Sequence, residues 1–324
     1  MTIKKLAKYK ELANPQIRPR YHGLATFMRA PFTEELTEVD IALVGVPFDG
    51  GVTNRPGARH GPREVRNQSS LMRVFNQATG ANPYTGLRVR DVGDAWVEQP
   101  FELEGALGEI AAFFGEIGRA GVMPISCGGD HSVTLPILRG IARAAPVGLV
   151  HFDAHCDTGD DYLGSKFHHG APFRRAVEEG LVDPKRTIQI GIRGGINDPK
   201  IWAFSHDSGM RVVYMEEFHD KGWRWAAEEA CRVAGTGPVY VTFDVDGLDP
   251  VYAPGTGTPE AGGITMVEAQ RMIRMLKDLD IVGGDVVEVA PPFDPSGTTA
   301  LNGATLMFEI LCVAAEALRR RKGR

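Results

Sequence analysis

Short apolar runs separated by helical stretches constrain the fold of this chain more than any other feature. The runs are rich in Val and Ile and do not alternate strictly with polar residues, which is typical of strands buried on both faces of a parallel sheet. Between them, apolar residues recur at helical spacing, as from Leu103 to Ile117 and from Val267 to Leu276, where Thr265 supplies an N-cap. The predicted strands are Ile41 to Val46, Val122 to Ser126, Gly148 to Phe152, Thr187 to Ile192, Arg211 to Met215, Val239 to Val245 and Ile281 to Val289.

The alternation of strands and helices predicts an α/β fold with three layers, α/β/α, around a mainly parallel, doubly wound sheet. The 324 residues, 43% of them hydrophobic, are enough to bury a large core. No shift in composition marks a linker, so we predict one domain over residues 38–324. Residues 1–37 contain three prolines and no clear period, and are predicted to form an N-terminal arm.

Composition and charge exclude several classes of protein. A net charge of −5 gives no basic surface for nucleic acid, and the one cationic run, Arg319 to Lys322, is predicted to be a solvated tail. Four widely spaced cysteines without a C-x-x-C pair indicate neither a zinc knuckle nor a disulfide framework. No 18 consecutive residues are apolar, and no apolar segment follows the lysine-rich start. We therefore expect a cytoplasmic protein that binds neither nucleic acid nor membrane.

Side chains able to bind metal follow three of the predicted strands. Ligand sites in open parallel sheets lie beyond the carboxyl ends of the strands. In Asp153-Ala154-His155-Cys156-Asp157 and in Asp244-Val245-Asp246 the donors occupy alternate positions, which points them to one side. In Gly128-Gly129-Asp130-His131 the glycines let the backbone turn and His131 opens a helix. The predicted metal donors are His131, Asp153, His155, Asp157, Asp244 and Asp246.

Together, these four carboxylates and two imidazoles predict a pair of cations. An isolated Asp-x-Asp at a strand end is common, but the full set would repel strongly unless a cation lay among them. Six donors exceed what one catalytic ion with an open position would use, whereas carboxylates that bridge two ions account for all six. Mostly oxygen donors favour Mn²⁺, although Ni²⁺, Co²⁺ or Zn²⁺ also fit. A water shared by two such ions is acidic enough to become a nucleophile near neutral pH.

This constellation resembles the ureohydrolase family, which includes arginase, agmatinase and the guanidino-acid hydrolases. The resemblance extends from Ile41 onward, so that residues 38–324 would form a single ureohydrolase catalytic domain with an arginase-like fold. It implies a metal-dependent hydrolase that cuts a guanidino compound into urea and an amine, without an organic cofactor, and a homo-oligomer, either a trimer or a hexamer. The motifs that carry it are Gly57-Ala58-Arg59-His60-Gly61-Pro62, Gly128 to Ser132, Asp153 to Asp157, Phe243 to Pro250 and Ala253 to Pro259.

The resemblance also implies how the donors are shared between two manganese ions. One ion would be bound by His131 and Asp157, and the other by His155 and Asp246. Asp153 and Asp244 would bridge the two ions.

Three residues acquire catalytic roles from the same resemblance. Glu288 matches the carboxylate that clamps the substrate guanidinium, a fork of N–H donors that suits a carboxylate, although outside the family it would suggest an ordinary salt bridge. His169, which precedes Gly170, matches the histidine that passes a proton to the leaving amine, and His168 is the alternative in the next register. Asp157 would also accept a hydrogen bond from the attacking hydroxide.

The loop from Thr158 to Lys166 is expected to select the substrate. It lacks the Asn-rich and Ser-rich pattern of arginases and is similar to the agmatinase-type branch, which contains guanidinopropionase and guanidinobutyrase. Tyr162 would line the substrate site and shorten the pocket, which favours a short guanidino acid such as 3-guanidinopropionate or 4-guanidinobutyrate. Lys166, Arg193 and Arg29 are candidates to bind its carboxylate.

Two other groups of hypotheses remain open. Asp160 and Asp161 would suit the ammonium group of agmatine, so agmatinase activity is the alternative within the branch. A histone-deacetylase-like amidohydrolase would need one zinc ion and a Tyr or His pair for the carbonyl oxygen. A non-catalytic partner subunit would be expected to have lost a metal ligand, and all six are present.

Overall fold

The chain folds around one eight-stranded sheet. The computed structural model describes residues 19–141, 145–198 and 200–323. The strand order is β2-β1-β3-β8-β7-β4-β5-β6 and every neighbouring pair is parallel, which confirms the predicted sheet. The strands are β1 (Ile41–Gly45), β2 (Val89–Asp94), β3 (Met123–Cys127), β4 (Val147–Phe152), β5 (Val182–Ile192), β6 (Arg211–Tyr214), β7 (Pro238–Asp244) and β8 (Asp280–Val287).

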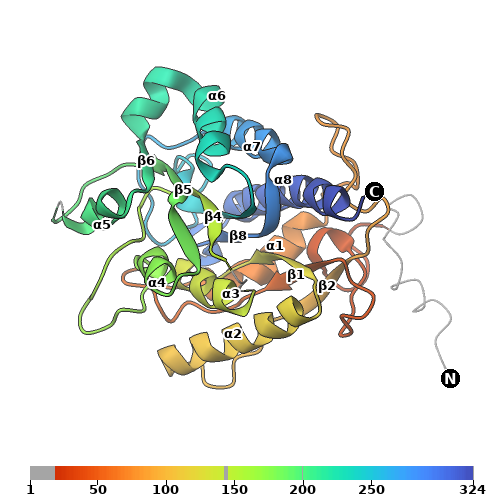
Figure 1. Ribbon diagram of the computed structural model, residues 1–324. Coiled ribbons are helices and arrows are strands. Elements are labelled where there is room, and N and C mark those ends of the chain that lie inside the picture. The colour runs from red at the N-terminus through yellow and green to blue at the C-terminus, as the bar shows by residue number, and fades with distance from the viewer. Residues whose placement is uncertain (1–18, 142–144, 199, 324) are drawn as a thin grey trace, which may run out of the picture.

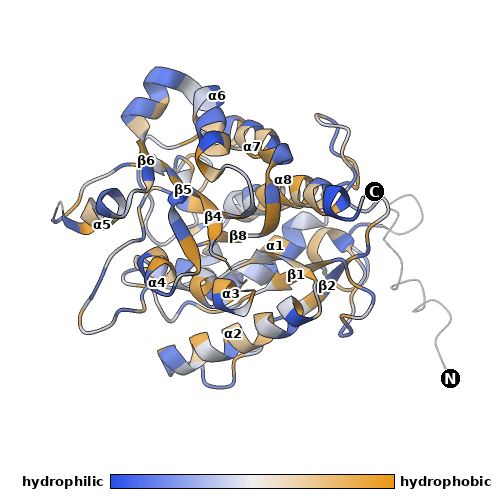
Figure 2. Cartoon of the chain, viewed as in Figure 1, coloured by the Kyte–Doolittle hydropathy of each residue, from blue (hydrophilic) through white to orange (hydrophobic). Residues whose placement is uncertain are grey.

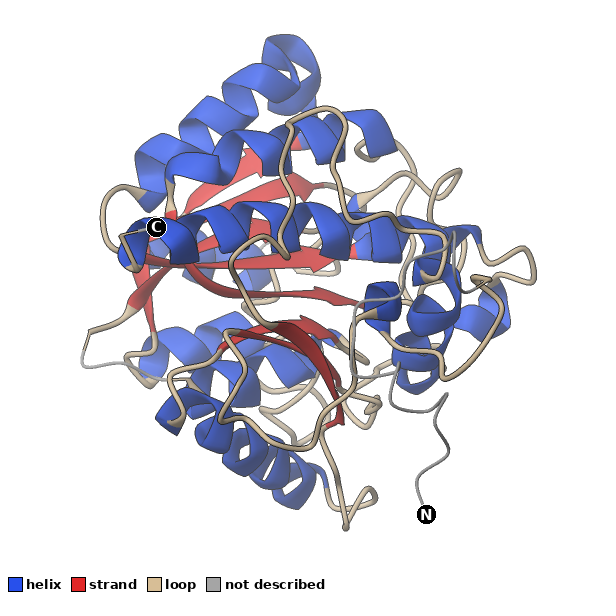
Figure 3. Cartoon of the chain, turned by 90° about the vertical axis from the view of Figure 1, so that its right-hand side faces the viewer, coloured by secondary structure: helices blue, strands red, loops and turns tan. Residues whose placement is uncertain are grey.

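Helices cover both faces of the sheet, so the predicted three layers are confirmed (Figures 1 and 3). Alternate residues of β1 show why the strands are apolar throughout: Ile41 and Leu43 join one apolar cluster, and Ala42 and Val44 join the other (Figure 2). The first cluster includes residues of α1 (Gly61–Ser69), α6 (Met215–Ala234), α7 (Met266–Met275) and α8 (Thr298–Arg321); the second includes α2 (Leu103–Arg119), α3 (Thr134–Gly140) and α4 (Pro172–Glu178); α5 (Lys200–Ser208) packs against β5 and β6.

Helix α7 begins where it was predicted to begin. Thr265 and Glu268 form a capping box, in which each side chain accepts from the backbone of the other. The predicted apolar stripe is wrong at Val267, which is exposed, whereas Met266 and Ala269 are buried.

Helix α8 is the one described helix long and apolar enough to cross a membrane by length and composition. Of its most apolar window, 78% is buried inside the protein, where α8 packs along β8. A long apolar helix that is mostly buried against a sheet is typical of the core of a layered fold.

Strand β2 was not predicted, because its sequence, Val-Arg-Asp-Val-Gly-Asp, is polar. Asp91 of this strand is nevertheless buried, and its carboxylate lies 2.9 Å from Nε of Arg66. The same carboxylate accepts a hydrogen bond from the backbone N–H of Phe27 at 2.8 Å. This buried ion pair forms only in the folded chain. It stabilises β2 although the sequence of the strand has no apolar pattern.

The N-terminal arm predicted over residues 1–37 lies partly outside the described residues, which begin at 19. Its later part packs against the domain, since Phe27 and Met28 belong to the first apolar cluster. The boundary between arm and domain stays a prediction.

The cationic run at the C-terminus is exposed at residues 320–322, as predicted, but it ends α8 and is held by hydrogen bonds, so it is not a free tail. The last turn of α8 lies beside the amino ends of β1 and β8, where its cations bind backbone carbonyls and carboxylates. Arg319 donates to the carbonyl of Thr85 at 3.0 Å, Arg320 donates to that of Leu279 at 2.7 Å, and Lys322 pairs with Asp40.

We expect Asp40→Asn to destabilise the protein in a pH-dependent way. Burial would raise the pKa of Asp40, but its bonds to Arg88 and Lys322 hold that pKa well below its ordinary value. A depressed pKa contributes stability above the unfolded value of about 4, and this stability is lost as the pH falls. Urea denaturation should show a loss of about 1–2 kcal/mol at pH 7 that shrinks below about pH 4. The control is Asp220→Asn, at an exposed site; equal losses for Asp40→Asn at pH 7 and pH 3 would contradict the expectation.

Candidate metal centre and substrate pocket

Three strands, β3, β7 and β4, deliver the predicted metal donors to one edge of the sheet, and β8 delivers Glu288, the predicted substrate clamp. Strands β3, β8, β7 and β4 are consecutive in the sheet, so their carboxyl ends meet. His131 follows β3 and opens a short 3-10 helix, His131–Val133, while Glu288 follows β8. The other metal donors are Asp153, His155 and Asp157, which follow β4, Asp244, which ends β7, and Asp246, which follows it. Residues distant in sequence therefore form one cluster.

The glycines before His131 provide room for close packing, Gly129 against a neighbouring backbone and Gly128 against the side chains of Val287 and Val133, which corrects the role predicted for them. Gly128 and Gly129 are not among the residues with positive φ. A Cβ on Gly129 would lie 1.6 Å from the carbonyl oxygen of Phe48. Any side chain there would displace the loop that enters the site from β1.

The imidazole of His131 faces three carboxylates at the centre of the cluster. Its Nδ1 lies 3.0 Å from Oδ2 of Asp157, 3.1 Å from Oδ2 of Asp153 and 3.3 Å from Oδ2 of Asp244. This nitrogen is buried and directed at the space between these oxygens, with no single hydrogen-bond partner. Its Nε2 lies 2.9 Å from Oγ1 of Thr242, which leaves Nδ1 available as a ligand.

A second group of donors shares Asp153 with the first. Nδ1 of His155 lies 3.4 Å from Oδ1 of Asp153 and 3.2 Å from Oδ2 of Asp246. Ligand oxygens of Asp153, Asp244 and Asp246 all lie within 4.8 Å of one another. Carboxylate oxygens thus lie between two histidines, as two neighbouring ions would require.

The electrostatics of the cluster favour the binding of cations. Burial raises the pKa of Asp244 well above its ordinary value, and the negative charges of Asp246 and Asp153 raise it further. Burial also raises the pKa of Asp246 to about 6, with Asp153 adding to the effect. For His131, burial would lower the pKa, but the surrounding carboxylates raise it well above normal. Oxygen-rich donors with two imidazoles and excess negative charge fit divalent cations.

His151 and Gln189 support the cluster from behind and were not predicted. Nε2 of the buried His151 lies 2.7 Å from Oδ2 of Asp153, while Nδ1 lies 3.1 Å from Nε2 of Gln189. Because both ring nitrogens are engaged, His151 orients a ligand and does not act as one. Its position two residues before Asp153, on the same face of β4, was the available signal.

Glu288 lies next to the cluster in a strained backbone conformation. Its φ is +63° and that of Asp157 is +50°, values rare for residues other than glycine and frequent at functional sites. Oε1 of Glu288 accepts from the backbone N–H of His131 at 3.0 Å. Oε2 is buried without a hydrogen-bond partner, so one carboxylate oxygen remains for another donor.

His169 bridges Glu288 and the loop after β1. Its Nδ1 lies 2.8 Å from Oε1 of Glu288, and its Nε2 lies 2.7 Å from Oγ1 of Thr53, a residue that no sequence pattern singled out. Burial lowers the pKa of His169, but the charge and hydrogen bond of Glu288, together with the charges of Asp130 and Asp157, outweigh that effect and raise the pKa to about 9. His168 binds the backbone carbonyl of Asp160 at 3.2 Å instead.

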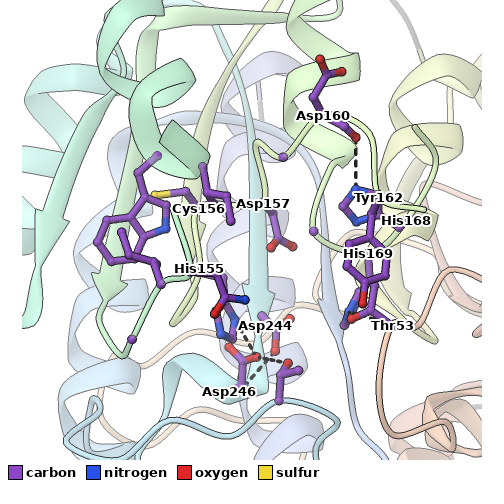
Figure 4. Close-up of a pocket in the computed structure, with 18 of the residues that line it drawn as sticks. Thr53, His155, Cys156, Asp157, Asp160, Tyr162, His168, His169, Asp244 and Asp246 are labelled. Atoms are coloured by element: carbon purple, nitrogen blue, oxygen red, sulfur yellow. Dashed lines mark hydrogen bonds and ion pairs between the residues drawn. The ribbon is translucent and has the colours of Figure 1, made fainter. Parts of the chain in front are cut away.

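A cavity of about 340 Å³ opens above the cluster (Figure 4). Figure 4 shows His155 and Cys156 on one side of it and Tyr162, His168 and His169 on the other. Tyr162 is 47% exposed and its ring lies 5.6 Å from that of His168. The far wall, which follows β5, consists of Gly195, Ile196, Asn197, Ile201 and Trp202.

The three cations proposed to bind a substrate carboxylate do not line this cavity, so those assignments are wrong. Arg193 is buried among backbone carbonyls. Arg29 is buried near the N-terminal segment and donates to the carbonyl of Met72 at 3.1 Å. Lys166 lines a separate small crevice, together with Leu135 and Phe167.

Asp160 is neutralised by two arginines of α4. Its carboxylate lies 3.1 Å from Arg174 and 3.0 Å from Arg175, and it points away from the cavity (Figure 4). Asp161 accepts from the backbone N–H of Gly164 at 3.0 Å within the loop.

Comparisons with known proteins agree on one family and one fold. A family model described as "Arginase family" matches residues 39–313. Guanidinopropionase of Pseudomonas aeruginosa is 55% identical over 93% of this chain and 95% of its own length. The mitochondrial agmatinase of Gallus gallus is 49% identical over 90% of this chain and 86% of its own. The solved structure of proclavaminate amidino hydrolase from Streptomyces clavuligerus has a TM-score of 0.88 and 37% identity, covering 92% of this chain and 99% of that one.

Proposed function

Because this chain belongs to the arginase family, as its motifs predicted, we propose that it hydrolyses a guanidino compound to urea and an amine. The single observation that carries the proposal is the convergence of His131, Asp153, His155, Asp157, Asp244 and Asp246 in one cluster, four of whose members, His155, Asp157, Asp244 and Asp246, line a substrate-sized cavity.

We propose two Mn²⁺ ions per chain for these donors. His131 and Asp157 would hold one ion, His155 and Asp246 the other, and Asp153 and Asp244 both. When bound, the ions would act as Lewis acids that make a water molecule nucleophilic near neutral pH. The oxygen-rich donor set supports manganese, although the general order of metal affinities would also allow Ni²⁺, Co²⁺ or Zn²⁺ to bind these donors.

The residues of the chain bind and protonate the substrate in this proposal. The free Oε2 of Glu288 would accept N–H donors of the guanidinium. Asp157 would accept a hydrogen bond from the attacking water. His169 has Nδ1 beside Glu288 and Nε2 beside Thr53, whose hydroxyl lies 2.7 Å away and whose backbone N–H donates to Nε2 at 3.3 Å. In its protonated form it would deliver a proton to the leaving amine.

We place a short guanidino acid, with 3-guanidinopropionate first, ahead of agmatine. The ammonium group of agmatine would need a free carboxylate, but Asp160 is paired with two arginines. The lining of the cavity instead includes residues with neutral hydrogen-bond donors, Tyr162 on one side and Asn197 and Trp202 in the segment after β5. Agmatine remains the alternative, because Asp161 also lines the cavity.

The test is release of urea by the Mn²⁺-loaded protein from 3-guanidinopropionate, 4-guanidinobutyrate, agmatine and L-arginine at equal concentrations. We expect the largest kcat/KM for one of the two guanidino acids and the smallest for arginine. Preference for agmatine would favour the alternative, and no release from any of the four would refute the proposal.

Tyr162→Ala should shift this preference toward longer substrates, because it removes a wall of the cavity. We expect the ratio of kcat/KM for 4-guanidinobutyrate over 3-guanidinopropionate to rise by about tenfold, the usual effect of one methylene in a pocket. Leu163→Ala is the matched control, since the neighbouring Leu163 is 90% exposed. An unchanged ratio in Tyr162→Ala would remove Tyr162 from the substrate site.

The proposal extends to a cytoplasmic homo-oligomer, a trimer or a hexamer, on the analogy of the family. Light scattering tests the assembly, and a monomer would contradict it. The rival hypotheses, a one-zinc amidohydrolase and a non-catalytic subunit, predict one ion per chain or no urea release.

A further inference from the structure

Arg193 is a buried cation at the end of β5, on the side of the metal cluster that holds Asp246. Arg193 is only 6% exposed. Within residues 19–141, 145–198 and 200–323, no carboxylate forms an ion pair with its guanidinium. All three of its nitrogens donate instead to backbone carbonyls, in hydrogen bonds of 2.6 to 3.2 Å.

These carbonyls belong to three separate segments. Nη1 binds the carbonyl of Gly191, in β5, at 3.0 Å and that of Gly247 at 3.2 Å. Nη2 binds the carbonyl of Asp246, itself a predicted ligand, at 2.7 Å and that of Leu248 at 3.1 Å. Nε and Nη2 reach the carbonyls of Glu260 and Ala261. One side chain thus ties the turn after β7 to β5 and to the loop at 260–261.

Burying a cation without a carboxylate partner costs free energy, so this arrangement requires compensation. Burial lowers the pKa of Arg193, and the nearby negative charges of Asp246 and Asp153 oppose that effect. The fold also leaves room for the guanidinium, since a Cβ on Gly263 would lie 2.5 Å from Nη2. The positive charge lies where the predicted ligands concentrate negative charge.

We propose that Arg193 is a positioning residue for the metal site: it fixes the turn Val245–Gly247 so that Asp246 and His155 hold their ion. The inference rests on the proposed function, because it concerns the same two ions. It assigns Arg193 to one ion specifically, since its contacts reach the backbone of Asp246 and not those of His131 or Asp157.

The planar fork of arginine is essential to this role. Its five N–H donors reach carbonyls in several directions at once, whereas the three donors of a lysine ammonium radiate from one atom at the end of a flexible chain. Arg193→Lys would keep the charge and lose the fork, while Arg193→Met would lose both.

The test is a calorimetric titration of chelator-treated protein with Mn²⁺, combined with metal analysis of the loaded protein. Wild type should bind two ions per chain. Arg193→Met should bind one of them about 10- to 100-fold more weakly, the usual cost of losing an outer partner of a metal ligand, while the other keeps its affinity. The affinity of Arg193→Lys for the more weakly bound ion should fall between those of wild type and Arg193→Met. Arg193→Lys replaces Arg193→Met in the test if the Met variant does not fold.

Arg186→Met is the matched control. Arg186 also lies on β5 and also donates to backbone carbonyls, those of Ala234 at 2.9 Å and Pro238 at 3.2 Å, but at the end of the strand away from the metal cluster. It should lower the melting temperature without changing either Mn²⁺ affinity.

The inference is overturned if folded Arg193→Met or Arg193→Lys binds both ions as wild type does, or if both ions weaken equally. That result would leave the proposed function intact. Conversely, if wild type binds two ions but releases no urea, the proposed function fails while the effect of Arg193 on one ion can still be measured.

Discussion

Asp244→Asn should abolish urea release and, in the same protein, raise the melting temperature measured without metal. Asp244 is buried, and burial together with repulsion from Asp246 and Asp153 raises its pKa, so keeping it ionised costs stability at neutral pH. Asn removes that cost and keeps an oxygen for the backbone N–H of Asp246, which now binds Oδ1 at 2.8 Å. With Mn²⁺ present, the same change removes a carboxylate that two ions would share.

We expect urea release to fall by more than about 10³-fold, because a catalytic metal supplies several kcal/mol of charge stabilisation and each 1.36 kcal/mol is a factor of ten. In chelator the melting temperature should rise by roughly 2 °C. Asp207→Asn, at an exposed site, should change neither quantity. A lower melting temperature in chelator would show that the carboxylate cluster does not carry unfavourable repulsion.

Glu288→Gln should lower kcat/KM by about 10²- to 10³-fold while leaving both metal ions bound, because it removes charge from the substrate clamp and not from a ligand. Gln keeps an oxygen for Nδ1 of His169 and for the backbone N–H of His131. The variant therefore separates recognition of the guanidinium from binding of metal.

The same substitution should move the pH profile. Burial lowers the pKa of His169, and the charge of Glu288 is the strongest of the influences, with the charges of Asp130 and Asp157, that together raise it to about 9. Losing that charge lowers the pKa, so less His169 is protonated at alkaline pH. If His169 is the acid, the alkaline limb of the kcat profile moves to lower pH. An unchanged limb together with full metal content would assign the proton transfer to another group.

Much of the fold and the metal cluster could be predicted from sequence because both depend on local patterns. Seven apolar runs correspond to observed strands, since a strand buried on both faces must be apolar throughout. The alternate spacing of the donors pointed to one shared site, although in the structure they lie in the bend after β4, at the last residue of β7 and in the short 3-10 helix Val245–Gly247, and so mostly not in extended strand. Parallel strands then bring these ends together.

What could not be predicted depends on contacts between distant segments. Strand β2 is stabilised by the buried pair of Asp91 and Arg66, and Phe27 joins the core without any periodic pattern. Lys322 meets Asp40 from the opposite end of the chain. None of these contacts can be predicted from the local sequence around either partner.

The walls of the pocket show the same limit. The positive charges of Lys166, Arg193 and Arg29 suggested contacts with the substrate carboxylate, but none of these three residues lines the cavity. Thr53 reaches His169 from a loop more than a hundred residues earlier in the chain. Specificity in this fold depends on loops, whose conformations follow from tertiary contacts.

The most direct test is to titrate chelator-treated wild-type protein with Mn²⁺ while counting bound ions and urea released from 3-guanidinopropionate. The predicted result is that activity is absent without metal and appears in step with binding of the second ion per chain. Full activity with one ion per chain, or urea release that survives complete removal of metal, would contradict a two-metal guanidino hydrolase.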